Sequence, residues 1–296
     1  MKKINALITG GSGFIGSHLT DTLTKSGFNV TIFDIKKPTQ KNNARVKFVR
    51  GDITNKNALI KALKNQDYVF HLAALMGTSE LLQCSDRAVH INIEGTVNVL
   101  EACKKQSVKA IILSKPHAWL NTYTITKQAA EKFAWMYKNE FGIQVAIVKF
   151  FNVYGPNEPA GKRAPYRKAV PTFILNGLAG KNIEIYGDGK QTADFVYVTD
   201  AVRALAMVAK NWNKCEGKTL EAGSGIKTSV NNLASIIRKL TGNKSEIIHV
   251  PMRPGEISGT HVLAKSGLLK KITGWKCEVS FEDGLKQTID WYKKTI

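Results

Sequence analysis

The sequence is poor in the residues that mark secreted and fibrous proteins, with 4 cysteines and 8 prolines in 296 residues. The cysteines lie far apart and form no Cys-x-x-Cys pair, which argues against a disulfide framework or a structural zinc site and favours a reducing compartment. No apolar run approaches the ~18 residues that a membrane helix needs. The apolar run at the start is too short for a signal peptide. We therefore expect a cytoplasmic globular protein with no bound metal and no membrane association.

Acidic residues are also scarce. The sequence has 23 of them against 43 lysines and arginines, which gives a formal net charge of +20 at pH 7. Such a balance can attract nucleic acids, anionic membranes or polyphosphate substrates. The basic residues are dispersed, however, and neither an RNA-binding aromatic signature nor a helix-turn-helix pattern accompanies them. We expect a lysine-rich solvated surface and no nucleic-acid partner.

Short apolar runs alternate with helical patterns through the first half of the chain. The runs predict strands over 4–8, 29–33, 46–49, 68–72, 110–113 and 144–150, and helices over 14–26, 88–104 and 122–139. Strands separated by helical crossovers of this length form a parallel sheet covered on both faces. The predicted fold class is therefore α/β with a doubly wound parallel sheet.

A glycine-rich turn, Gly10-Gly11-Ser12-Gly13-Phe14-Ile15-Gly16, connects the first predicted strand to the first helix. Glycines at 10, 13 and 16 permit a tight turn, close backbone approach to a pyrophosphate and close helix–sheet packing. Asp34 ends the second strand, where a carboxylate accepts hydrogen bonds from the adenosine ribose. The same carboxylate repels a 2′-phosphate, so we predict NAD rather than NADP as the cofactor.

The pattern changes after Tyr154-Gly155-Pro156, where prolines become frequent. We expect residues 1–155 to form a Rossmann-type dinucleotide-binding core to which 190–242 partly returns. Residues 156–189 and 243–296 then form a smaller C-terminal substrate-binding lobe.

Tyr123 and Lys127 lie four residues apart at the start of a predicted helix, and so on one face of it. A tyrosine with a pKa near ~10 is a poor base at neutral pH unless a nearby cation stabilises its phenolate. A lysine one turn further on can supply that charge. After a dinucleotide fingerprint, this pair predicts a tyrosine base beside the nicotinamide.

Together these motifs resemble the extended short-chain dehydrogenase/reductases. The segments FFNVYGP at 150–156, YGDGKQTADFVYVTDA at 186–201 and RPGE at 253–256 are similar to the nucleotide-sugar epimerase/dehydratase branch, closest to its UDP-glucose 4-epimerase-like members. The resemblance covers nearly the whole chain. It implies an NAD-dependent enzyme, often a homodimer, acting on a nucleotide-diphosphate sugar such as a UDP-hexose.

The resemblance also assigns roles to individual residues. It implies Tyr123 as the base, Lys127 as the residue that orients the nicotinamide ribose, and Ser114 as the candidate for the hydroxyl that assists the tyrosine. It places Asn152, Arg253 and Glu256 against the substrate. The implied cofactor-binding residues are Gly10, Gly13, Phe14, Ile15, Gly16, Asp34, Ile35, Asp52, Ile53, Leu72, Ala73, Ala74 and Lys127.

Three departures from the family pattern bear on the chemistry. The segment between Ser114 and Tyr123 is short, and Lys115 or His117 could take the place of the assisting hydroxyl. Lys115-Pro116-His117 lacks the carboxylates that a 4,6-dehydratase needs as acid and base, so dehydration is disfavoured.

The third departure concerns phosphate binding. Ala193 stands where the family has an arginine, and Lys149 where an arginine commonly precedes the FFN segment. We expect phosphate contacts to move onto Arg253 and the basic segment around Arg163 and Arg167, because an arginine fork suits a phosphate.

These observations predict epimerisation of a nucleotide-diphosphate hexose at C4 through a transient 4-keto sugar. A nucleotide-4-keto-sugar reductase is the nearer alternative, and a 4,6-dehydratase a more distant one. A non-catalytic NAD-binding sensor or scaffold is the alternative from another class.

Overall fold

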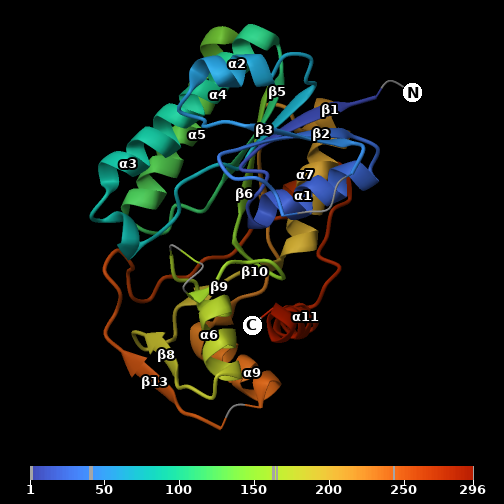
Figure 1. Ribbon diagram of the computed structural model, residues 1–296. Coiled ribbons are helices and arrows are strands. Elements are labelled where there is room, and N and C mark those ends of the chain that lie inside the picture. Colours follow the sequence, from blue (N-terminus) through green and yellow to red (C-terminus); the bar gives the residue numbers. More distant parts are fainter. Residues whose placement is uncertain (1–2, 40–42, 162–163, 165, 243, 296) are drawn as a thin grey trace.

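The centre of the computed structural model is a seven-stranded sheet in the order β3-β2-β1-β4-β5-β6-β11 (Figure 1). The structure describes residues 3–39, 43–161, 164, 166–242 and 244–295. All neighbouring strands of this sheet pair in parallel. Its strands are β1 (Asn5–Thr9), β2 (Asn29–Asp34), β3 (Val46–Arg50), β4 (Tyr68–His71), β5 (Lys109–Ser114), β6 (Val145–Phe150) and β11 (Thr219–Ala222). The predicted α/β Rossmann-type sheet is confirmed.

Helices cover both faces of the sheet. One face carries α1 (Phe14–Lys25) and α7 (Val198–Lys210), which pack together (Figure 1). The other carries α2 (Lys56–Ala62), α4 (Gly95–Gln106) and α5 (Thr122–Phe141). Because both faces are covered, the strands are apolar throughout, and Ala6, Leu7 and Ile8 have no exposed surface.

The single helix predicted over 88–104 is wrong in detail. The structure has α3 (Ser85–Val89), a π-helical segment η2 (His90–Glu94) and then α4. The wider turn places Asn92 inside the molecule, where its side chain accepts from Leu75 N at 2.7 Å and donates to Leu75 O at 2.9 Å. These two bonds fix the segment that follows β4, and a periodicity of 3.6 residues gives no sign of such a bulge.

A second lobe lies at the carboxyl ends of the strands (Figure 1). Its hydrophobic core joins α6 (Ala169–Leu178), α9 (Val230–Thr241) and α11 (Phe281–Thr295). Short strand pairs complete it: β7 (Asn152–Tyr154) with β10 (Phe195–Tyr197), β8 (Ile183–Tyr186) with β13 (Ile247–Val250), and β9 (Thr192–Ala193) with β12 (Thr228–Ser229). The remaining short elements are η1 (Ser79–Leu81), α8 (Trp212–Cys215) and α10 (Gly267–Thr273).

The segment 190–242 is shared between the two lobes. Its α7 packs on α1 and its β11 pairs with β6, whereas its α9 packs on α6 and α11. We propose that the boundary between core and lobe falls between β11 and α9. Within the described residues, no helix combines the length and apolar character needed to cross a bilayer.

Candidate active site

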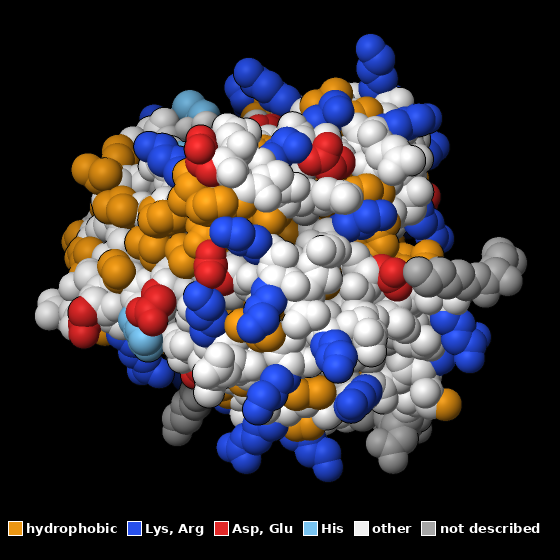
Figure 2. Space-filling view, turned by 90° about the horizontal axis from the view of Figure 1, so that it is seen from above, with side chains coloured by type: hydrophobic (Ala, Val, Ile, Leu, Met, Phe, Trp, Pro, Cys, Tyr) orange, Lys and Arg blue, Asp and Glu red, His pale blue; other side chains and the backbone are white. Residues whose placement is uncertain are grey.

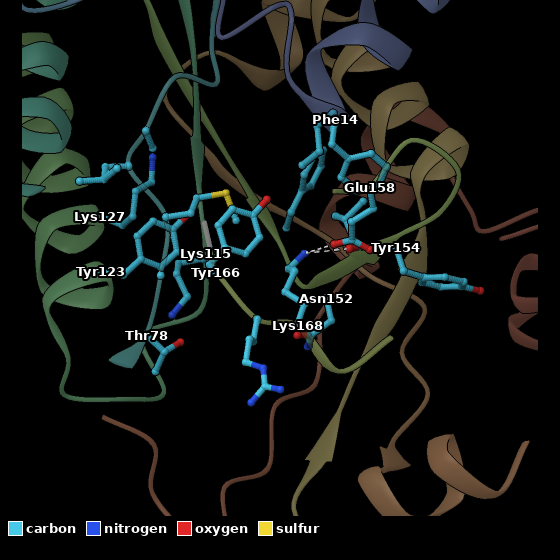
Figure 3. Close-up of a pocket in the computed structure, with 18 of the residues that line it drawn as sticks. Phe14, Thr78, Lys115, Tyr123, Lys127, Asn152, Tyr154, Glu158, Tyr166 and Lys168 are labelled. Carbon is cyan, nitrogen blue, oxygen red and sulfur yellow. Dashed lines mark hydrogen bonds and ion pairs between the residues drawn. The ribbon is translucent and has the colours of Figure 1, made fainter. Parts of the chain in front are cut away.

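A cavity of about 680 Å³ lies where the carboxyl ends of the strands face the second lobe. Figure 3 shows side chains from both lobes that line it. In an open parallel sheet this edge, next to the point where the strand order reverses between β1 and β4, is the usual position of a bound nucleotide.

The glycine turn forms one end of the cavity. Gly10 has a φ of +70°, and a Cβ there would lie 2.8 Å from the backbone nitrogen of Ala73. A Cβ on Gly16 would collide with the carbonyl oxygen of Gly10. Gly13 is the N-cap of α1, and the first turn of that fully described helix carries no acidic residue. The turn therefore presents backbone N–H groups and a positive helix end to an anion.

Asp34 ends β2 beside this turn and lines the cavity. Its Oδ2 accepts from the backbone nitrogen of Ser12 at 3.0 Å, and its Oδ1 accepts from that of Lys36 at 3.0 Å. One donor on each oxygen fixes the carboxylate and leaves lone pairs for further donors. The arrangement suits the hydroxyl groups of a ribose.

The remaining residues predicted to bind the cofactor also line the cavity. Ala73 N donates to the hydroxyl of Thr9 at 3.3 Å, which holds the chain after β4 against β1. The lining residues of this set, beyond the glycines and Asp34, are Phe14, Ile15, Ile35, Asp52, Ile53, Leu72, Ala73, Ala74 and Lys127.

Tyr123 and Lys127 extend from the first turns of α5 on the same side of the cavity (Figure 3). Burial raises the pKa of Tyr123 to about 12, against the positive charge of Lys168, which lowers it. Burial lowers the pKa of Lys127 to about 8, against the Glu131 carboxylate, which raises it. Within the described residues the Tyr123 hydroxyl has no hydrogen-bond partner, so it is available to a ligand.

Ser114 does not contact Tyr123. Its hydroxyl donates to Glu131 Oε2 at 3.0 Å. His117 Nε2 lies 3.0 Å from the same oxygen and Lys149 Nζ 3.0 Å from Glu131 Oε1. These three side chains form a polar cluster around Glu131, and within the described residues neither the Ser114 hydroxyl nor the His117 ring forms a hydrogen bond with Tyr123.

Lys115 takes the position beside the tyrosine. Its Nζ donates to Thr124 Oγ1 at 2.7 Å and lies 5.5 Å from the ring centre of Tyr123. Burial lowers its pKa to about 8. Of the three groups that could replace the usual hydroxyl, Lys115 is the one that adjoins Tyr123.

Glu158 and Lys168 are functional candidates that the sequence did not reveal. Glu158 is 1% exposed, and its Oε1 lies 2.7 Å from Lys168 Nζ. Its other oxygen, Oε2, is buried and has no hydrogen-bond partner among the residues that the structure describes. Burial raises the pKa of Glu158, although Lys168 opposes that shift. A glutamate two residues after Tyr154-Gly155-Pro156 was the available signal.

Arg253 lies in the cavity wall, 9% exposed, between two carboxylates. Its Nη2 is 3.4 Å from Glu80 Oε2 and its Nε is 3.6 Å from Glu256 Oε1. Glu80 also accepts from the backbone nitrogen of Arg167 at 2.9 Å. The fork is thus held by Glu80 of η1 and by Glu256, three residues further along its own segment. Arg163 lies outside the described residues.

Asn152 lines the cavity from β7, and its Nδ2 donates to the carbonyl oxygen of Asp194 at 3.4 Å. Asp194 has no exposed surface and accepts from the backbone nitrogens of Ser224, Gly225 and Ala264. Asp194 therefore holds three chain segments together, while its neighbour Ala193 reaches the cavity with only a methyl group.

Comparison with known proteins identifies relatives along the whole chain. The model of the NAD dependent epimerase/dehydratase family matches residues 6–120 and 112–223. A UDP-N-acetyl-alpha-D-glucosaminuronate decarboxylase of Bacillus cytotoxicus is 33% identical, over 99% of this chain and 99% of its own.

Solved structures agree with this fold. A UDP-glucose 4-epimerase of Thermotoga maritima with UDP-glucose has a TM-score of 0.89 at 30% identity, covering 99% of each chain. A UDP-glucuronic acid 4-epimerase of Bacillus cereus in complex with UDP-glucuronic acid and NAD has a TM-score of 0.90 at 29% identity, covering 99% of this chain and 100% of that one.

Proposed function

The chain belongs to the NAD-dependent epimerase/dehydratase family, and from that premise we propose that it epimerises a nucleotide-diphosphate hexose at C4. The observation that carries the proposal is the pair Tyr123 and Lys127 in one cavity with the glycine turn and Asp34. Relatives that act on UDP-sugars support UDP as the nucleotide.

The residues present fit NAD as the cofactor. The glycines let the turn pack against Ala73 and against its own backbone, which a Cβ at Gly10 or Gly16 would prevent, and this close packing leaves backbone N–H groups for a pyrophosphate. Asp34 suits the adenosine ribose, and Lys127 faces the cavity where it would hold the nicotinamide ribose. When bound, NAD⁺ supplies a hydride acceptor for C4 and a positive charge beside Tyr123.

The protein's own groups move the proton. Tyr123 takes the proton of the C4 hydroxyl and gives it back after the 4-keto sugar has turned over in the cavity. Because burial raises the pKa of Tyr123 to about 12, its phenolate depends on nearby positive charge. Lys168 lowers that pKa, and Lys127, 4% exposed, adds a cation on the same helix. The second lobe excludes water and orients the sugar, with Arg253 facing the diphosphate.

Proton NMR of the purified protein with UDP-, dTDP-, GDP- and CDP-hexoses, without reductant, tests the reaction. A new anomeric signal from a C4 epimer is the expected result, with NAD retained on the protein. Stoichiometric consumption of reduced nicotinamide would instead identify a 4-keto-sugar reductase. Loss of carbon dioxide or of water would identify a decarboxylase or a dehydratase.

Replacing Tyr123 by phenylalanine removes the base and keeps the ring. We expect turnover to fall about 10³-fold with NAD still bound, because a general acid–base group typically contributes a rate factor of this size. Tyr137→Phe is the matched control, since Tyr137 lies on the same helix but donates to Glu101 at 2.8 Å. Near-normal turnover in Tyr123→Phe contradicts the proposal.

We also propose a homodimer through the outer surface of α3 and α5. Figure 2 shows hydrophobic side chains gathered on the side of the molecule where these helices lie. Val89, Ile125, Phe133 and Met136 are each at least 37% exposed there. Light scattering of the wild type and of Phe133→Glu is expected to give a dimer and a monomer, respectively. A monomeric wild type contradicts this assembly.

A further inference from the structure

Lys115 is a cation in the part of the cavity around Tyr123. The proposed function places the sugar there, and we call this part the sugar end. Lys115 follows β5 directly and lines the cavity together with Trp119 and Tyr123. Its Nζ lies 5.4 Å from the ring centre of Trp119 and 5.5 Å from that of Tyr123. Figure 3 shows Lys115 on the same side of the cavity as Tyr123 and Tyr166.

Within the described residues, no carboxylate pairs with Lys115. Its hydrogen-bond partner is the neutral hydroxyl of Thr124, and the two aromatic rings stabilise its charge without cancelling it. Lys127 is a further cation close by, and its pKa is lowered first by burial and then by repulsion from Lys115. A partly buried cation in this setting is costly unless a ligand supplies the anion.

Three other cations at or behind the sugar end already face carboxylates, whereas the Arg167 guanidinium, which also lines the cavity, donates to the Tyr186 hydroxyl. Lys168 pairs with Glu158 at 2.7 Å, and Arg253 lies between Glu80 and Glu256. Lys149 pairs with Glu131 in the cluster behind the cavity. Lys115 therefore differs from these three paired cations in having, within the described residues, no carboxylate partner and an open position for an anion.

The chemistry of a nucleotide sugar limits what that anion can be. When C4 lies at Tyr123, the diphosphate on C1 is across the pyranose ring from it. The substituent on C5 is adjacent to C4 and thus near Lys115. The hydroxyl on C3 is also adjacent to C4, but C6 is the one of the two neighbouring substituents that can be an anion: it is an alcohol in a hexose and a carboxylate in a hexuronate.

We propose that Lys115 selects a nucleotide-diphosphate hexuronate, by pairing its ammonium group with the C6 carboxylate of the sugar. This inference rests on the proposed function in placing C4 at Tyr123. Burial lowers the pKa of Lys115 to about 8, so the amine stays largely protonated at neutral pH and retains the charge that the pairing needs.

A competing role for Lys115 is support of the Tyr123 phenolate or the C4 oxygen. The two roles differ in what they predict for neutral sugars. A lysine that serves only C4 affects hexoses and hexuronates by the same factor, because both have the same C4 hydroxyl. A lysine that binds the carboxylate changes the ratio between them.

The test compares wild type with Lys115→Met, which keeps an unbranched side chain one atom shorter than lysine and removes its charge. For each NAD-loaded protein, kcat/KM is measured with UDP-glucuronate and with UDP-glucose, and Kd for both by calorimetry. Lys132→Met is the matched control, because Lys132 is exposed on α5. A melting curve of each variant checks that it is folded.

We expect the wild type to prefer UDP-glucuronate, and Lys115→Met to lower the uronate-to-hexose ratio at least about tenfold, as loss of a charge-assisted hydrogen bond does. Preference of the wild type for UDP-glucose, or an equal loss with both sugars, overturns the inference. If neither sugar turns over, the proposed C4 epimerisation fails, and the ratio of the two Kd values still decides the role of Lys115. Release of carbon dioxide from the uronate would support the substrate class and contradict epimerisation.

Discussion

The two ends of the cavity differ in the protein groups that line them: one is lined mostly by backbone and the other by side chains. The cofactor end is made mostly of backbone, namely the glycine turn and the first turn of α1, together with the side-chain carboxylate of Asp34 at the end of β2. The sugar end is made of long charged side chains from loops far apart in the sequence, such as Lys115, Glu158 and Arg253. A backbone site tolerates almost no added atom, whereas a side-chain site can change its ligand by single substitutions. Under the proposed function, the cofactor end thus fixes the reaction, and the side chains of the sugar end select the substrate.

The largest effect is expected at the cofactor end. Gly16→Val places side-chain atoms against the carbonyl oxygen of Gly10, where the backbone cannot move aside. We expect NAD binding to be lost, measured by calorimetry and by the cofactor that copurifies. Gly267→Ala is the control, because a Cβ at Gly267 meets nothing within 4 Å. Normal NAD affinity in Gly16→Val would contradict the claim that the backbone at the cofactor end cannot accept added atoms.

A smaller and more selective effect is expected from Arg253→Gln at the sugar end. Loss of the guanidinium removes a charged partner of the diphosphate, so KM for the nucleotide sugar should rise about 10–100-fold. NAD affinity should stay the same, since Arg253 lies in the other half of the cavity. Arg238→Gln on the exposed surface of α9 is the control. A parallel loss of NAD affinity would show that the two ends are not separate.

The smallest effect is a shift in pH dependence caused by Lys168→Met. Lys168 lowers the pKa of Tyr123, so its removal raises that pKa. Because the phenolate is the active form, the acidic limb of the profile of kcat/KM against pH should move to higher pH. Lys239→Met, on α9, should leave the profile unchanged. A shift toward lower pH would contradict the assigned role of Lys168.

The difference between the two ends of the cavity also explains which features of the fold and of the site could be predicted from the sequence. Gly10, Gly13, Gly16 and Asp34 are readable because their role follows from local backbone geometry over a single strand–turn–helix unit. Six strands of the central sheet follow from apolar runs for the same reason. Tyr123 and Lys127 are one helical turn apart, so their shared face is also a local property.

The sugar end depends on tertiary contacts that no short pattern carries. Ser114 is a plausible assisting hydroxyl from its position in the chain, yet in the structure it donates to Glu131, eight residues beyond Tyr123 on α5. The pair of Glu158 with Lys168 joins residues on either side of a loop. The π-helical segment around Asn92 likewise interrupts a helix whose apolar pattern runs on without a break.

Asn121 gives the site a mechanical property. Its side-chain oxygen accepts from Thr124 N at 2.9 Å and caps the helix that carries Tyr123, while its amide nitrogen donates to the carbonyl oxygen of Gly255 at 2.9 Å. This buried side chain therefore couples the order of the first turn of α5 to the packing of the segment that carries Arg253. Local opening of that segment withdraws a restraint on the cap of α5, so the position of Arg253 and the rigidity of the helix end that carries Tyr123 belong to one cooperative unit.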